Sequence, residues 1–200
     1  MCAECEADFF PAARARCVVC AIPLTVAGAV CGRCQATPPH FQQTTALADY
    51  APPVAGMVTA LKFGARLDLA TAFGRLLARR IAPDPTALVV PVPLAYERHA
   101  ERGFNQSLQI ARAFCSASGA RLDSEVIRRI RHAPPQQTLE LAERRRNVRG
   151  AFEATRRIDG AHVLMIDDVM TSGSTLDEVA RVLGQAGAVQ LRALVVARTA

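Results

Sequence analysis

Residues 163–175 restrict the fold more than any other part of the chain, because an apolar run, two carboxylates and a small polar loop follow one another there. Val163 to Ile166 has the apolar, β-prone character of a buried parallel strand, and apolar residues recur at helical spacing from Leu176 onward. The polar loop therefore joins the carboxyl end of a strand to the amino end of a helix. Such a unit is typical of an α/β domain with a mostly parallel sheet, whose ligands bind beyond the carboxyl ends of the strands.

The loop has the composition of a phosphate-binding site. Backbone N–H groups at a helix N-terminus have no partner within the helix, and the helix dipole favours negative charge there. Asp167 and Asp168 precede the loop, where carboxylates can accept hydrogen bonds from two neighbouring hydroxyls of a sugar. Taken separately, the aspartates fit a solvated strand end and the loop fits a helix cap, but their order favours a site for a ribose 5-phosphate. The candidate phosphate-binding residues are Thr171, Ser172, Gly173, Ser174 and Thr175.

Two other nucleotide-binding motifs are excluded in this loop. No Gly-Lys-Ser/Thr sequence follows, as a Walker-type loop requires, and a single glycine cannot make a dinucleotide fingerprint. The pattern resembles the signature of type I phosphoribosyltransferases, which bind 5-phosphoribosyl-1-pyrophosphate (PRPP). The resemblance implies that Asp167 and Asp168 are catalytic, because they would hold the ribose hydroxyls and stabilise the positive charge that develops as pyrophosphate leaves. It also implies a Mg²⁺ ion that arrives with PRPP and keeps most of its waters.

Six of the seven cysteines form three Cys-x-x-Cys pairs. The last two pairs are separated by ten residues, a spacing that suits one closed, tetrahedral Zn²⁺ site in a small ribbon. For the first pair, Cys2 and Cys5, three interpretations stay open: competition for the same ion, weak metal binding, or a second site completed by a pair upstream of Met1. Disulfides are the weaker explanation in a chain without secretory features. The candidate zinc ligands are Cys17, Cys20, Cys31 and Cys34.

The composition fits one α/β domain with a small appendage. Residues 1–43 contain the cysteine pairs, and residues 44–200 alternate between strand and helix patterns. The segment 128–149 is too charged and polar to be plain core structure. Strands are expected at 44–50, 87–92, 163–166 and 193–197, and helices at 54–63, 67–81, 104–115 and from residue 174.

Charge and hydropathy limit the classes of binding partner and the cellular locations that we expect for the protein. The net charge of +6 comes from arginine, since Lys62 is the only lysine, and we interpret Lys62 as a charge at a helix end. An arginine excess suits polyphosphates or nucleic acid, and it is equally what a GC-rich, Ala-rich coding sequence produces. No apolar stretch reaches membrane-spanning length and the N-terminus lacks the pattern of a signal peptide, so we expect a cytoplasmic protein with no membrane insertion.

A second group of motifs follows the neighbouring strand. Pro91-Val92-Pro93-Leu94 ends that strand, and Arg102-Gly103-Phe104-Asn105-Gln106 comes shortly after it. Together with residues 137–152 and the aspartate motif, these segments resemble the ComF/GntX family. That family joins an N-terminal zinc ribbon to a type I phosphoribosyltransferase-like domain, and it is associated with natural competence and the use of external DNA.

This second resemblance implies further PRPP-binding residues. Pro93 and Leu94 would lie beside PRPP at the strand end. Residues 128–149 match the position of a flexible hood that closes over the substrate and excludes water. Within that segment, Arg129, Arg131 and Arg145 would neutralise the pyrophosphate.

The sequence is compatible with two functions of different classes. The first is Mg²⁺-dependent displacement of pyrophosphate from PRPP by an acceptor that no segment identifies. The second is a non-catalytic module, with PRPP as a sensor ligand. Its zinc ribbon and basic surface would hold single-stranded DNA or would dock on a competence helicase. Single-strand platforms need exposed aromatic residues beside basic ones, and only Phe9, Phe10 and Phe41 lie near the ribbon.

Overall fold

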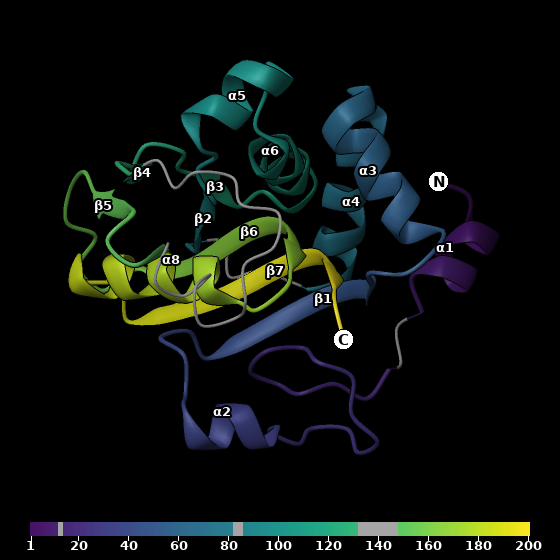
Figure 1. Ribbon diagram of the computed structural model, residues 1–200, viewed down its shortest axis with the longest axis horizontal. Helices are drawn as coiled ribbons and strands as arrows, with labels where there is room; N and C mark the ends of the chain where they lie inside the picture. Colours follow the sequence, from purple (N-terminus) through teal and green to yellow (C-terminus); the bar gives the residue numbers. More distant parts are fainter. Residues whose placement is uncertain (12–13, 82–85, 132–147) are drawn as a thin grey trace.

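The computed structural model describes residues 1–11, 14–81, 86–131 and 148–200, and its centre is a parallel sheet flanked by helices (Figure 1). Within the described residues, five strands form this sheet in the order β1-β7-β6-β2-β3, and every neighbouring pair is parallel. The expected α/β fold is therefore confirmed. The strands are β1 (Gln43–Asp49), β2 (Leu88–Pro91), β3 (Arg121–Leu122), β6 (His162–Met170) and β7 (Gln190–Arg198).

The central strands are covered on both faces, because side chains of β6 alternate between two apolar layers. Val163 and Met165 belong to the layer that includes α8, whereas Leu164 and Ile166 belong to the layer that includes α3, α4 and α6. Successive residues of a strand point to opposite faces, which explains why both sets are apolar. The four helices are α3 (Val54–Gly64), α4 (Leu67–Arg80), α6 (Gln106–Ser118) and α8 (Ser174–Gln185).

The cysteine-bearing segment packs directly on the sheet, with α2 (Gly32–Ala36) on the side of β1 in Figure 1. Cys17, Cys20 and Phe41 are buried in the same apolar layer as Val163. The segment therefore shares its core with the domain that follows. The domain boundary at residue 43 remains a prediction.

Helix α1 (Ala3–Phe9) lies in a different place, near α3 and α4 (Figure 1). Phe10, which follows α1, packs edge to face on Phe73 of α4, with ring centroids 6.0 Å apart. The Arg80 guanidinium also donates a hydrogen bond to the Phe10 carbonyl at 2.7 Å. The N-terminal residues are thus fixed to the helical layer on the opposite face of the sheet from α8.

Strand β6 is longer than the sequence indicates. It pairs with β7 as far as Met170, which lies opposite Arg198, so Asp167 and Asp168 lie within the strand rather than after it. Aspartate is depleted in strands, and the apolar run ends at Ile166, which is why the extension was not expected. The helix predicted from residue 174 does begin at Ser174.

Three further short elements complete the described structure. They are α5 (Tyr96–Arg102) and an antiparallel pair, β4 (Ile127–Arg129) and β5 (Phe152–Ala154). The sequence did not predict them. Residues 132–147, most of the predicted hood, lie outside the described residues. In the described part of the chain, no helix combines the length and the apolar character that crossing a membrane requires.

Candidate functional site

A cavity of about 310 Å³ opens beyond the carboxyl ends of β2 and β6. Its walls come from β6 and the loop after it, the segment after β2, α5, the first turn of α6, the last turn of α3, and β4. Carboxylates lie in β6, and arginines come from α5 and β4. The lining residues are Tyr50, Lys62, Val92, Pro93, Leu94, Arg98, Arg102, Gln106, Ser107, Arg129, Asp167, Asp168, Val169, Thr171 and Thr175.

Asp167 is held at this cavity by two donors to its Oδ1 atom. The Ser107 hydroxyl donates to it at 2.9 Å, and the backbone N–H of Asp168 donates at 2.9 Å. Burial and the neighbouring Asp168 carboxylate raise the pKa of Asp167 to about 7, in spite of the donors and of Lys62 nearby. This side chain therefore holds its proton to a higher pH than an ordinary aspartate does.

Asp168 is buried, with 4% of its surface exposed. Its Oδ1 accepts the Val169 backbone N–H at 2.6 Å, and the Lys62 ammonium lies 3.0 Å from its Oδ2. That second contact is an ion pair at hydrogen-bonding distance, so Lys62 is the charge partner of the buried Oδ2. Lys62 therefore offsets the charge of a carboxylate that burial would otherwise penalise.

Arginine side chains from α5 and β4 also line the cavity. The Arg102 guanidinium lies 4.9 Å from the ring centroid of Phe63 and donates to Gln106 Oε1 at 3.2 Å, while its buried Nε has no partner among the described residues. Burial and the charge of Arg98 lower the pKa of Arg102, and the same two causes lower that of Arg129. Cations crowded in this way favour an anion between them.

The predicted phosphate-binding loop lies at the N-terminus of α8, and its residues divide between two cavities. Thr171 and Thr175 line the cavity that contains the aspartates, whereas Ser172, Gly173 and Ser174 line a second cavity of about 340 Å³ on the side of the cysteines. Gly173 has φ +80°, a conformation that favours glycine. The Ser172 and Ser174 hydroxyls lie 2.8 Å apart and can donate to one another or to an anion.

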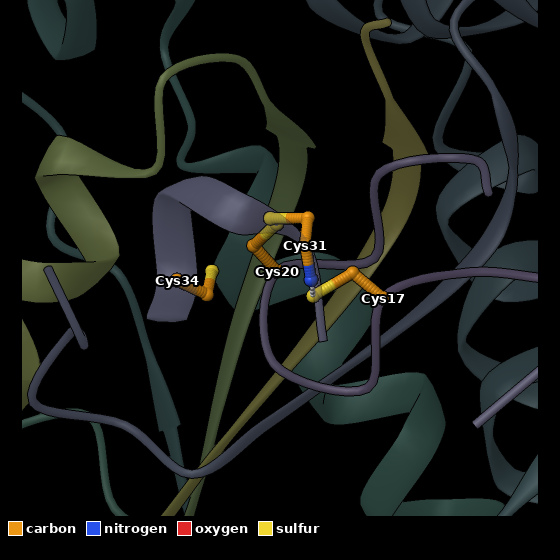
Figure 2. A group of neighbouring side chains, drawn as sticks. All are labelled: Cys17, Cys20, Cys31 and Cys34. Carbon is orange, nitrogen blue, oxygen red and sulfur yellow. Dashed lines mark hydrogen bonds between the residues drawn. The ribbon is translucent and has the colours of Figure 1, made fainter. Parts of the chain in front are cut away.

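The four predicted zinc ligands come together beside α2, as Figure 2 shows. Their sulfur atoms all lie within 4.8 Å of one another, and those of Cys20 and Cys31 are 3.6 Å apart. Sulfurs bound to one tetrahedral zinc ion at about 2.3 Å lie about 3.8 Å from each other. The geometry of Cys17, Cys20, Cys31 and Cys34 therefore fits a zinc ion.

The thiol electrostatics fit the same ion. Although burial opposes ionisation of Cys17, backbone N–H donors, among them that of Cys31 at 3.3 Å, lower the pKa of its thiol to about 7. Burial and the neighbouring Cys20 and Cys31 sulfurs raise the pKa of Cys34. Without a cation, repulsion between these crowded sulfurs keeps them from all ionising. A divalent cation binds the thiolate form and removes that repulsion.

Comparison with known proteins agrees with the combination of a four-cysteine group and a parallel α/β domain. The family model of the phosphoribosyl transferase domain matches residues 68–200. The DNA utilization protein YhgH of Escherichia coli O6:H1 is 37% identical over 190 residues, which cover 92% of this chain and 84% of that protein. Competence protein F of Haemophilus influenzae is 26% identical over 178 residues, or 84% of this chain and 78% of its own length. The chain belongs to the ComF family.

The sheet of this ComF-family chain has the phosphoribosyltransferase type of fold. Among solved structures, the glutamine PRPP amidotransferase of B. subtilis resembles it with a TM-score of 0.47 and 22% identity, over 68% of this chain and 30% of that enzyme. The family model and the curated relatives confirm the expected resemblance at the level of family and fold.

The structure of the ComF-family chain does not bring every predicted residue to the cavity. Pro93, Leu94 and Arg129 line it, whereas Arg131 does not. Cys2 and Cys5 lie outside the four-sulfur group, and in the described residues they form no metal-binding group with a third ligand. The role of Arg131 and the second metal site therefore remain predictions.

Sequence reasoning missed two residues that shape the site. Lys62 does lie in the last turn of α3, but its ammonium also pairs with Asp168, and Ser107 holds Asp167. A signal for Ser107 exists in the sequence. Asn105 caps α6, accepting the Ser107 N–H at 2.9 Å, and the polar pair that follows it is buried where an amphipathic helix usually begins with exposed residues.

Proposed function

We propose that this ComF-family protein binds PRPP in the cavity beyond β6 and transfers its phosphoribosyl group to an acceptor, with release of pyrophosphate. The observation that carries the proposal is a pair of adjacent carboxylates, Asp167 and Asp168, that lines one cavity together with arginines at the carboxyl ends of parallel strands. The names of the relatives, DNA utilization protein and competence protein, support a role in the use of external DNA.

The carboxylates suit the ribose end of PRPP. Asp168 would accept one ribose hydroxyl at Oδ2, and Asp167 would accept the other once it has lost its proton. The two negative charges would then face C1, where positive charge develops as the bond to pyrophosphate breaks. The acceptor supplies the electron pair of the new bond to C1, and pyrophosphate leaves with the electrons of the old one.

The arginines suit the pyrophosphate end. Arg98, Arg102 and Arg129 line the same cavity as the aspartates. Burial and the charge of Arg98 lower the pKa of both Arg102 and Arg129, so an incoming polyphosphate would relieve this repulsion. Mg²⁺ bound to PRPP would supply further neutralisation of the leaving group. The 5-phosphate would lie at the N-terminus of α8, against Thr171 and Thr175.

Arg102→Gln is expected to weaken PRPP binding about 10-fold, because a charge-assisted contact in a shielded cavity is lost. Arg112→Gln is the matched control, since Arg112 is exposed on α6 and does not line the cavity. Titration calorimetry with both variants measures the effect. Equal affinities in the two variants would contradict the placement of pyrophosphate beside Arg102.

Turnover is tested by incubating the protein with PRPP, Mg²⁺ and a panel of bases, amines and nucleotides while pyrophosphate release is followed. We expect release with one class of acceptor, and we expect Asp167→Asn combined with Asp168→Asn to abolish it. If PRPP binds but no acceptor gives more pyrophosphate release than the double variant shows, the transfer step is refuted and only PRPP binding is retained.

Two of the three aromatic residues near the ribbon do not support the single-stranded DNA alternative. Phe10 and Phe41 are 2% and 3% exposed, so neither ring is available for stacking on a base. An electrostatic DNA complex would lose affinity steeply with salt. A competence helicase as partner remains a prediction, with no feature of the structure that favours it.

A further inference from the structure

Three consecutive backbone carbonyls at the start of the phosphate-binding loop are held by two arginines. Arg198, at the end of β7, donates through Nη1 to the carbonyls of Met170 at 3.1 Å and Thr171 at 2.6 Å. Arg33 donates through its own Nη1 to the carbonyl of Ser172 at 3.2 Å. The loop's path from β6 into α8 is therefore set by side chains from outside the loop.

Both arginines are also tied to the cysteine centre, which is the group formed by Cys17, Cys20, Cys31 and Cys34. Arg33 lies in α2 between Cys31 and Cys34, inside the third Cys-x-x-Cys pair. Arg198 donates through Nε to the carbonyl of Cys20 at 2.8 Å. Each arginine thus joins one of the two cysteine pairs to the loop, and no other described segment makes side-chain hydrogen bonds to these three carbonyls.

Charge explains why a cation is buried at this place. Arg198 is 2% exposed, and its hydrogen-bond partners in the described residues are backbone carbonyls and the hydroxyl of Thr199, with no carboxylate among them. A buried cation needs a compensating negative charge. Four thiolates around one Zn²⁺ carry a net charge of about −2, and the sulfurs of Cys20 and Cys31 are close enough to act on the Arg198 guanidinium.

We propose that Arg198 and Arg33 are positioning residues that couple the cysteine centre to the phosphate-binding loop, so that metal occupancy and PRPP affinity depend on each other. The metal-bound centre holds the two guanidiniums by charge, and they hold the carbonyls of residues 170–172. The loop then presents its N–H groups to the 5-phosphate without further ordering. The inference rests on the proposed function for its ligand, but the geometry that carries it belongs to the loop itself.

The test compares the zinc-loaded full chain in four forms: wild type, Arg33→Gln, Arg198→Lys and Arg14→Gln. Arg14 is the control, because it is exposed in the same segment and pairs with Asp49 instead of the loop. Zinc affinity is measured by competition with a chromogenic chelator, with and without PRPP and Mg²⁺. By linkage, we expect PRPP to tighten zinc binding about 10-fold in wild type and Arg14→Gln, and less than about 3-fold in the other two.

A second measurement needs no PRPP. Amide hydrogen exchange of residues 171–176 is expected to be about 10-fold faster in Arg33→Gln than in Arg14→Gln, with exchange in β7 unchanged. Arg33 is exposed, so its variant is expected to fold even where Arg198→Lys does not. If wild type binds no PRPP, the proposed function fails and exchange alone decides the coupling. Equal loop exchange in Arg33→Gln and Arg14→Gln, or equal tightening of zinc by PRPP in all four forms, overturns the inference.

Discussion

Asp167→Asn is expected to raise the free energy of unfolding by about 2 kcal/mol at pH 8 while it weakens PRPP binding. Burial and the Asp168 charge raise the pKa of Asp167 to about 7, well above the ordinary value of an aspartate. Between those two pKa values the folded protein holds a proton that the unfolded chain has released, so this group makes wild type less stable as pH rises. The neutral amide removes that cost.

Urea unfolding at pH 5 and pH 8 checks the sign of this effect. The gain in stability should be smaller at pH 5, where only part of the cost has developed. Asp68→Asn is the control, because Asp68 is exposed and its pKa is lowered by the hydrogen bond from Arg66, so the amide should bring no gain. A loss of stability in Asp167→Asn at pH 8 would identify Asp167 as a structural residue and would contradict its assignment to the binding site.

Loss of the zinc site is expected to be the most destabilising change in the cysteine-bearing segment. We expect about one zinc ion per chain, and Cys34→Ser should abolish tight zinc binding and lower the free energy of unfolding by about 4 kcal/mol. The reason is that Cys17, Cys20 and Cys34 are buried in the apolar layer of the sheet, so an open site exposes core surface.

Cys115→Ser provides the matched control for this change. Cys115 lies on α6, outside the four-sulfur group, and burial raises the pKa of its thiol to about 11. Metal analysis should find the same zinc content as in wild type. Cys5→Ser distinguishes the interpretations of the first pair: zinc content stays at one per chain if Cys2 and Cys5 are not ligands. A metal-free chain with the thermal stability of wild type would refute the structural role of the ion.

The parts of the site that are local in sequence could be predicted, and the parts assembled by tertiary packing could not. The aspartates, the loop and the cysteine pairs each follow one another within a few residues, so spacing alone indicates their chemistry. Lys62 and Ser107 reach the aspartates from α3 and α6, which only the tertiary packing of those helices brings near β6. Arg198 looks like the polar end of an apolar strand until its bonds to residues 20, 170 and 171 are known.

The central claim is that the cavity beyond β6 binds PRPP through Asp167 and Asp168, and titration calorimetry of the zinc-loaded protein tests it most directly. With Mg²⁺ present we expect saturable heat for PRPP, much weaker binding of ribose 5-phosphate, and binding that strengthens between pH 6 and pH 8 as Asp167 loses its proton. Without Mg²⁺, or in the variant that combines Asp167→Asn with Asp168→Asn, the heat should disappear. Absence of heat from the wild-type protein at millimolar PRPP with Mg²⁺, or equal heat from the double variant, would contradict the account.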